Sequence, residues 1–225
     1  MDPTSAPTLP TRAPLLERIR IGLDALDHLK DDPGDPYQAT LLNISLDSRV
    51  YAALARTWRA SPEGRRLLAE RPSLQGPELD LEALARLPEG TFGHAVARYF
   101  AANGITPFVT PFRVDDDLAY ISKRYRETHD LAHVVTGYGT DELGEMELQA
   151  FVLGNLGIPS AALILAFSTA MRLRRTGLRD LAPYLARLRA AYRRGRRSRE
   201  LLSVSYERLW DKPVAMVAEL LCAPA

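Results

Sequence analysis

The residue pattern best suited to chemistry in this chain is a pair of histidines four residues apart, His129 and His133. On an α-helix such residues lie about 40° apart on one face, so both imidazoles can reach one metal ion. Glu145 follows twelve residues after His133. Catalytic sites for zinc and similar ions commonly use three His or carboxylate ligands and leave one position open. We therefore predict a divalent metal, zinc being the first candidate, on His129, His133 and Glu145.

Asp130 directly follows the first histidine and has three candidate roles. It lies about 60° around the helix from His133, so it could be a fourth metal ligand, an acceptor that orients a ligand, or a base acting on water at the metal. The pattern does not choose among these roles. We take Asp130 and Glu145 as the candidate catalytic groups. The alternative to metal binding is that His129 and His133 are hydrogen-bonded core residues.

Other metal chemistries fit this pattern less well. Metalloproteases carry His-Glu-x-x-His, whereas Asp130 is one methylene shorter and would place its carboxylate nearer the metal than the usual base. A dimetal phosphohydrolase would need additional upstream His and downstream Asp ligands.

Arg124 and Arg126 precede the motif and could bind a substrate carboxylate or phosphate, the alternative being solvated helix arginines.

The elements that must position these residues are all predicted to be helices. The motif helix should run over about 116–136 and end at Gly137, and Asp141 should begin the next helix, so that Glu145 can fold back against the histidines. Apolar periodicity and cap residues predict further helices over 15–30, 36–60, 61–71, 79–87, 91–103, 180–199, 199–209 and 213–221, with an extended connector over 105–114. The fold class is therefore predicted to be all-α, and the metal site should lie between two helices.

An uncharged stretch over 148–171 raises the question of a membrane span. Polar residues, glycines and Pro159 interrupt it, so we predict two buried helices that meet near Gly157-Ile158-Pro159. The basic cluster Arg187–Arg199 could contact anionic lipid headgroups, and a solvated face or an ion-pair network is the alternative.

Composition limits the partners and the compartment. The 225 residues carry a formal net charge of +1, so no global field would recruit nucleic acid. The single cysteine, Cys222, excludes an intrachain disulfide and fits a reducing compartment. Residues 1–14 are rich in proline and lack signal-peptide features. We predict a flexible tail over 1–14, one compact helical domain over 15–225, and a cytoplasmic location with peripheral contact at the inner face of the cell membrane.

The site residues resemble the signature of the ubiquinone (coenzyme Q) biosynthesis protein family. That signature is His-Asp-x-x-His, a glycine four residues on, and then Gly-Glu. It reads here as His129-Asp130-Leu131-Ala132-His133, Gly137 and Gly144-Glu145. The similarity covers roughly residues 15–221 and includes Leu87-Pro88-Glu89-Gly90-Thr91-Phe92-Gly93, Ala97-Arg98-Tyr99-Phe100, Arg124-Tyr125-Arg126-Glu127, Trp210 and Pro213. Mitochondrial members begin with a targeting sequence, which residues 1–14 do not resemble, so a bacterial homologue is expected.

The resemblance implies a compact α-helical fold and zinc or another divalent metal on His129, Asp130, His133 and Glu145. It implies oxidative decarboxylation, in which a hydroxyl replaces the carboxyl on the ring of a polyprenylated benzoquinone precursor. The alternative is a non-catalytic lipid-binding scaffold that presents this precursor to other ubiquinone biosynthesis enzymes. In either case residues 148–171 would wall an apolar groove for the prenyl tail. The expected partners are the prenylated precursor or a polyprenyl lipid, those enzymes and a membrane surface, and a homodimer is left open.

Overall fold

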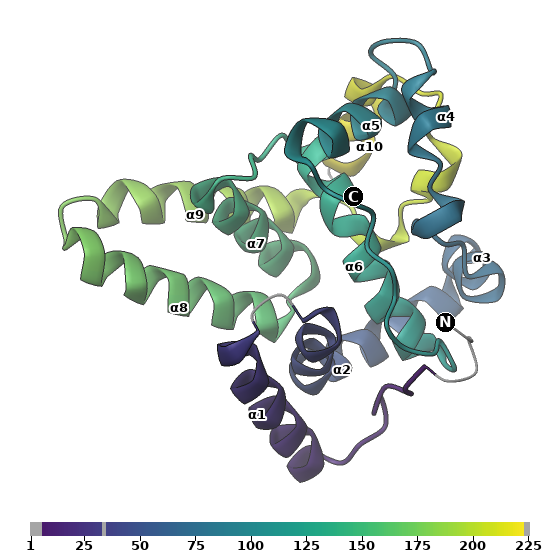
Figure 1. Ribbon diagram of the computed structural model, residues 1–225. Coiled ribbons are helices and arrows are strands. Elements are labelled where there is room, and N and C mark those ends of the chain that lie inside the picture. The colour runs from purple at the N-terminus through teal and green to yellow at the C-terminus, as the bar shows by residue number, and fades with distance from the viewer. Residues whose placement is uncertain (1–5, 33–34, 223–225) are drawn as a thin grey trace. The chain divides into compact units, whose positions relative to one another are not determined.

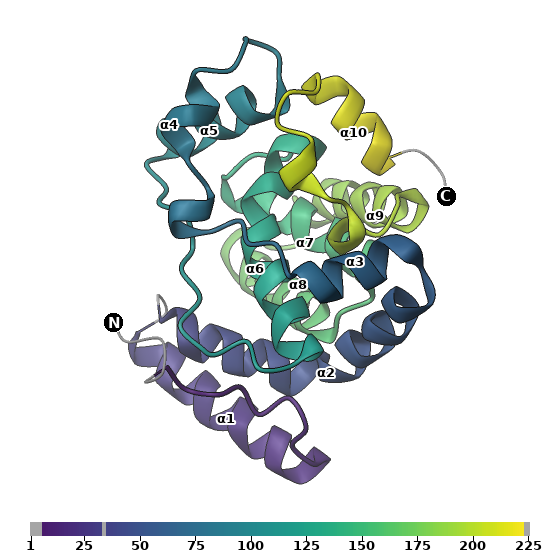
Figure 2. The same cartoon turned by 90° about the vertical axis from the view of Figure 1, so that its right-hand side faces the viewer.

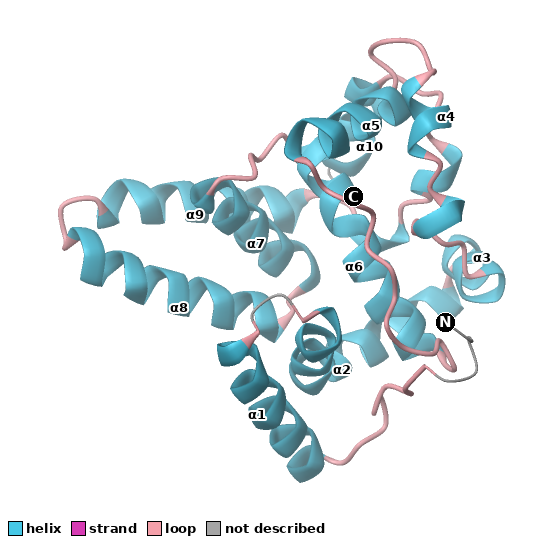
Figure 3. Cartoon of the chain, viewed as in Figure 1, coloured by secondary structure: helices cyan, strands magenta, loops and turns pink. Residues whose placement is uncertain are grey.

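The computed structural model describes residues 6–32 and 35–222, and these residues form ten α-helices and three short 3-10 helices. Figure 3 shows helices and loops, with no strand in the described ranges. Two isolated backbone bridges, Thr8 with Arg113 and Thr91 with Pro213, are the β-type pairings found there. The predicted all-α fold class is confirmed.

The helices belong to two compact units. One unit comprises the chain up to Gly76 together with Phe108–Glu127, and the other comprises Pro77–Pro107 together with the chain from Thr128. Helix α6 (Asp117–Thr136) therefore contributes its first half to one unit and its second half to the other. The expectation of a single domain over 15–225 stays a prediction.

The first unit is built on a close pairing of α1 (Leu15–Asp31) with α2 (Pro36–Ala60), which lie side by side in Figures 1 and 2. The Arg18 guanidinium reaches across and donates to the Ser45 carbonyl at 2.7 and 3.0 Å. A Cβ at Gly22 would lie 2.5 Å from Ser45 Oγ, so a larger residue there would require the Ser45 hydroxyl to move. Helix α3 (Pro62–Glu70) completes the unit together with the start of α6.

The flexible tail predicted over 1–14 is partly packed. Residues 1–5 lie outside the described residues, but Leu9 is buried in a cluster with Phe112 and Ala119. Thr11 Oγ1 donates to Asp116 at 2.6 Å, and the Arg113 amide donates to the Pro7 carbonyl at 2.8 Å. Apolar burial and these hydrogen bonds hold the segment against the connector, which is extended as predicted.

Helix boundaries coincide with residues that cap helices. Five helices begin with an N-cap side chain that accepts a hydrogen bond from an amide of the first turn. The caps are Asp35 for α2, Ser61 for α3, Asp80 for α4 (Leu81–Ala85), Thr91 for α5 (Phe92–Asn103) and Asp141 for α7 (Glu142–Leu156). Gly104, Gly137 and Gly157 end α5, α6 and α7 with positive φ. Two predicted helices change. The helix over 79–87 shortens to α4, preceded by η1 (Gly76–Glu78), and the segment 199–209 contains the 3-10 helices η2 (Leu201–Ser203) and η3 (Tyr206–Arg208) in place of an α-helix.

The core of the second unit lies where α7 meets α9 (Leu181–Arg197). Two glycines make this crossing possible. A Cβ at Gly154 would lie 2.2 Å from the Tyr192 carbonyl oxygen, and one at Gly195 would lie 2.0 Å from the Phe151 carbonyl oxygen. Buried side chains beside the crossing are Ala150, Tyr184, Leu188 and Ala191. The last helix of the unit is α10 (Val214–Cys222).

The uncharged stretch over 148–171 forms two helices, as predicted, but only the first is buried. Helix α7 ends at Leu156 and α8 (Pro159–Thr176) begins two residues after Gly157. Helix α8 forms a hairpin with α9 (Figure 1) and buries only Ser160 and Ala161. Phe167 is 67% exposed, so the prediction of two buried helices is wrong for α8. No helix within the described ranges is long and apolar enough to cross a membrane.

Candidate metal centre

The turn between α6 and α7 folds the predicted site together. Gly137 has φ +75°, and its amide donates to the His133 carbonyl at 2.8 Å, which closes α6. Asp141 begins α7 by accepting from the Gly144 amide at 2.8 Å. A Cβ at Gly144 would lie 2.2 Å from the Gly139 carbonyl oxygen. Glycine at this position therefore lets the turn lie against the first turn of α7, which also carries Glu145.

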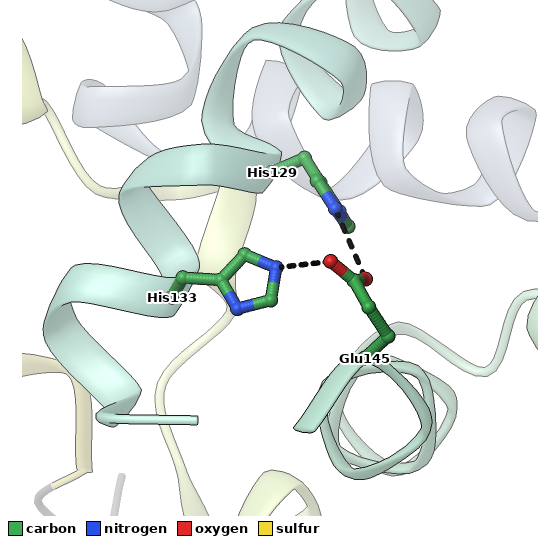
Figure 4. Close-up of side chains that lie close together, drawn as sticks. All are labelled: His129, His133 and Glu145. Atoms are coloured by element: carbon green, nitrogen blue, oxygen red, sulfur yellow. Dashed lines mark ion pairs between the residues drawn. The ribbon is translucent and has the colours of Figure 1, made fainter. Parts of the chain in front are cut away.

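Three of the four predicted metal ligands lie together in the second unit. In Figure 4 the Glu145 carboxylate from α7 faces both imidazoles from α6. His133 Nε2 lies 3.1 Å from Glu145 Oε1, and His129 Nε2 lies 3.6 Å from Glu145 Oε2. One ligand atom from each of the three residues lies within 4.8 Å of the others. Their number and chemistry are those of a three-ligand divalent site.

His133 is oriented as a metal ligand should be. Its Nδ1 lies 3.0 Å from the Tyr138 carbonyl oxygen. Because a carbonyl only accepts, Nδ1 carries the proton and Nε2 is left to face Glu145. Nε2 is buried and, despite its closeness to Glu145, forms no hydrogen bond of good geometry with any described residue. An imidazole with one nitrogen held by a backbone carbonyl and the other nitrogen without a hydrogen bond of good geometry fits a metal ligand.

The site is closed on one side and open on the other. The side chain of His133 is 1% exposed, whereas those of His129 and Glu145 are 24% and 34% exposed. Solvent therefore reaches His129 and Glu145, while the side chain of His133 is covered. This is the arrangement expected where one coordination position is open to water or substrate.

The charges of the site are strongly coupled. Burial acts to raise the pKa of Glu145, but His129 and His133 outweigh it and lower that pKa to about 2. Burial acts to lower the pKa of His133, but Glu145, the Tyr138 carbonyl and the charge of Asp130 raise it above its ordinary value. Without a metal the site therefore favours a carboxylate beside an imidazolium, and a metal would displace the proton.

Asp130 lies beside the three-residue cluster and is not a member of it. Its side chain is half-buried, and its charge acts on His133 and on Tyr99. A direct ligand role for Asp130 stays a prediction. The position fits a group that acts on the site through its charge.

Arg124 and Arg126, the candidate substrate-binding residues, lie in the first unit. Arg124 is completely buried, with its guanidinium 3.4 Å from Tyr120 Oη, so it is not a solvated helix residue either. Arg126 is half-buried and places its guanidinium 5.2 Å from the ring centroid of Phe108. Neither arginine belongs to the three-residue cluster.

Tyr99 is a site residue that the sequence did not predict. It lies on α5, and its ring stacks on that of His133 at 5.7 Å between centroids with an interplanar angle of 18°. Its hydroxyl is buried and has no hydrogen-bond partner among the described residues. Burial and the charges of Asp130 and Glu145 raise the pKa of Tyr99 well above its ordinary value. The sequence pointed to Tyr99 only through the stretch Ala97-Arg98-Tyr99-Phe100, which resembles the ubiquinone biosynthesis protein family.

Comparison with known proteins identifies a family. The profile described as "Coenzyme Q (ubiquinone) biosynthesis protein Coq4" matches residues 39–222. A solved crystal structure of a Nostoc punctiforme PCC 73102 protein assigned to ubiquinone biosynthesis is 30% identical, with a TM-score of 0.73. The match covers 90% of this chain and 97% of that one.

Curated relatives carry the same description. The chain is 34% identical over 191 residues to the "Ubiquinone biosynthesis protein COQ4 homolog, mitochondrial" of Homo sapiens, covering 82% of this chain and 71% of that protein. The protein of the same name in Rattus norvegicus is 32% identical over 220 residues, covering 96% and 80%. Both relatives are named as mitochondrial, which contradicts the cytoplasmic location predicted from the sequence, and that prediction is wrong.

Proposed function

The chain belongs to the coenzyme Q (ubiquinone) biosynthesis protein Coq4 family, and from this premise we propose that it is a metal-dependent enzyme of that process. Its substrate is a polyprenylated aromatic acid, and its reaction replaces the ring carboxyl with a hydroxyl. The observation that carries the proposal is the His133 imidazole, whose Nδ1 is held by the Tyr138 carbonyl and whose buried Nε2 faces Glu145 beside His129. We propose zinc or another divalent ion as the cofactor.

The proposal gives each residue of the site a role. When bound, a divalent ion supplies Lewis acidity, which stabilises the negative charge that develops as carbon dioxide leaves. His133 and His129 hold it from α6, and Glu145 holds it from α7. Asp130 provides a base or a fixed negative charge at the edge of the site. The partial exposure of His129 and Glu145 supports entry of the aromatic head group from that side.

Metal content tests the site assignment. We expect the purified protein to bind one divalent ion, measured by elemental analysis, and His133→Ala and Glu145→Ala to lose it. His28→Ala is the matched control, because His28 Nδ1 donates to the Asp24 carbonyl of its own helix at 2.8 Å. Retention of metal by His133→Ala would contradict the assignment.

Turnover tests the reaction. Replacement of a carboxyl by a hydroxyl is a two-electron oxidation, so the assay combines the metal-loaded protein, a prenylated hydroxybenzoate, water and dioxygen, which takes up the two electrons and is reduced to hydrogen peroxide. We expect release of carbon dioxide and formation of the hydroxylated ring, both absent in Glu145→Ala. Binding of the prenylated acid without carbon dioxide release would contradict the enzyme.

A second candidate function is a lipid-presenting scaffold that hands the prenylated precursor to other ubiquinone biosynthesis proteins. The exposed apolar face of α8 favours it, since Leu163 and Phe167 are 47% and 67% exposed. On this reading we expect Phe167→Asp to weaken binding of a prenylated hydroxybenzoate while metal content is unchanged. Val109→Asp, at a residue 64% exposed in the connector, is the control.

A further inference from the structure

The Tyr99 hydroxyl is a buried polar group whose role the ligand set does not explain. Its ring is fixed by stacking on His133, and its Oη has no hydrogen-bond partner among the described residues. Buried hydroxyl groups in native proteins are nearly always hydrogen-bonded, and an exception calls for a missing water, ion or ligand. Since the ring contacts a predicted metal ligand, the missing partner of Oη belongs at the metal centre.

The chemistry of the neighbouring groups indicates what that partner is. The carboxylates of Glu145 and Asp130 can only accept hydrogen bonds when ionised, and His133 Nδ1 is already committed to the Tyr138 carbonyl. A phenol is protonated at neutral pH and donates one hydrogen bond. The Tyr99 hydroxyl therefore supplies what the acidic side chains lack, a neutral donor for an oxygen that carries negative charge.

We propose that Tyr99 is a substrate-positioning residue, whose hydroxyl donates a hydrogen bond to the carboxylate of the aromatic acid bound at the metal centre. This inference rests on the proposed function and adds to it the residue that recognises the carboxylate. A hydrogen bond to a charged acceptor is strong enough to orient a small head group. The stack on His133 sets the distance between donor and metal ligand without a covalent link.

A binding experiment tests the inference without turnover. The protein is loaded with Co²⁺, whose absorption spectrum reports on its ligands, and is titrated with 4-hydroxybenzoate. We expect Tyr99→Phe, which keeps the stacked ring, to bind one Co²⁺ as the wild-type does and to raise the Kd for 4-hydroxybenzoate about tenfold. Phenol, which lacks the carboxylate, should bind both proteins equally.

Tyr184→Phe is the matched control. The Tyr184 hydroxyl is also buried without a partner among the described residues, but it lies on α9 beneath the Arg172 guanidinium. Its removal should leave the Kd for 4-hydroxybenzoate unchanged. An unchanged Kd in Co²⁺-loaded Tyr99→Phe, or equal weakening of phenol and 4-hydroxybenzoate, would overturn the inference alone. Failure of the wild-type protein to bind metal would instead overturn the proposed function, and this inference with it.

Discussion

The two ring nitrogens of His133 have different neighbours, and this difference governs how the site titrates. Nδ1 donates to the Tyr138 carbonyl, while Nε2 faces Glu145 at 3.1 Å, with the charge of Asp130 nearby. In the metal-free protein these neighbours stabilise the protonated imidazole, and the imidazoles in turn stabilise the ionised carboxylate. Protons and metal therefore compete for the same atoms.

The metal-free protein should show a pH window of added stability. Glu145 has its pKa lowered from 4.5 to about 2, so its contribution is present above pH 4.5 and is lost as pH falls toward 2. His133 has its pKa raised from 6.5, so its contribution is present below pH 6.5 and is lost as pH rises through the folded-state pKa. We expect the largest stability gap between wild-type and Glu145→Gln between pH 4.5 and 6.5. Urea unfolding in EDTA measures it, and a gap that grows toward pH 9 would contradict the coupling.

The Asp130→Asn variant separates a role as a base from a role as a direct metal ligand. Because Asp130 lies outside the three-residue cluster, we expect the variant to keep one bound metal. If Asp130 acts as a base, turnover should fall by about 10²-fold to 10⁴-fold. Elemental analysis and carbon dioxide release measure the two quantities on the same sample. Loss of the metal would show instead that Asp130 is a direct ligand.

At the scale of elements, the α7–α9 crossing depends on Gly154 and Gly195. Helix propensity alone predicts that Gly195→Ala stabilises the protein by about 1 kcal/mol. The added Cβ would lie 2.0 Å from the Phe151 carbonyl oxygen, so the helices must move apart. We therefore expect a net destabilisation of about 1–3 kcal/mol by chemical unfolding. A stabilised variant would show that the crossing tolerates the methyl group.

The helix boundaries were predictable because their signals are local. Ser61 with Pro62, Asp141, and glycines such as Gly137 act within one turn of where they stand. The exposure of α8 was not predictable, because a segment that is apolar on all sides has the same pattern whether or not another element covers it. The contact of Tyr99 with His133 could not be predicted from periodicity either, since it joins residues 34 positions apart in the sequence that lie on two different helices. The metal ligands were recognisable because His129 and His133 share a helix.

At the scale of the whole molecule, metal binding should protect one unit selectively. The three residues of the cluster, His129, His133 and Glu145, lie in the second unit, from Thr128 onward. A ligand at a hundred times its Kd stabilises the folded state by about 2.7 kcal/mol, which slows amide exchange through opening of that site about 100-fold. We expect hydrogen exchange to slow in the second half of α6 and in α7. Peptides of α1 and α2 serve as the internal control, and equal slowing there would contradict a site confined to the second unit.

The hydrogen bond from His133 to Tyr138 has a consequence for how the site can vary. The acceptor is a main-chain oxygen, which every amino acid supplies, so substitution at position 138 changes the side chain without removing the group that fixes the imidazole proton. Libraries randomised at this position could therefore alter the packing of the Tyr138 ring against Phe151 while leaving the metal-facing nitrogen as it is. The hydrogen bond that leaves His133 Nε2 facing the metal centre is therefore preserved when the side chain at position 138 changes.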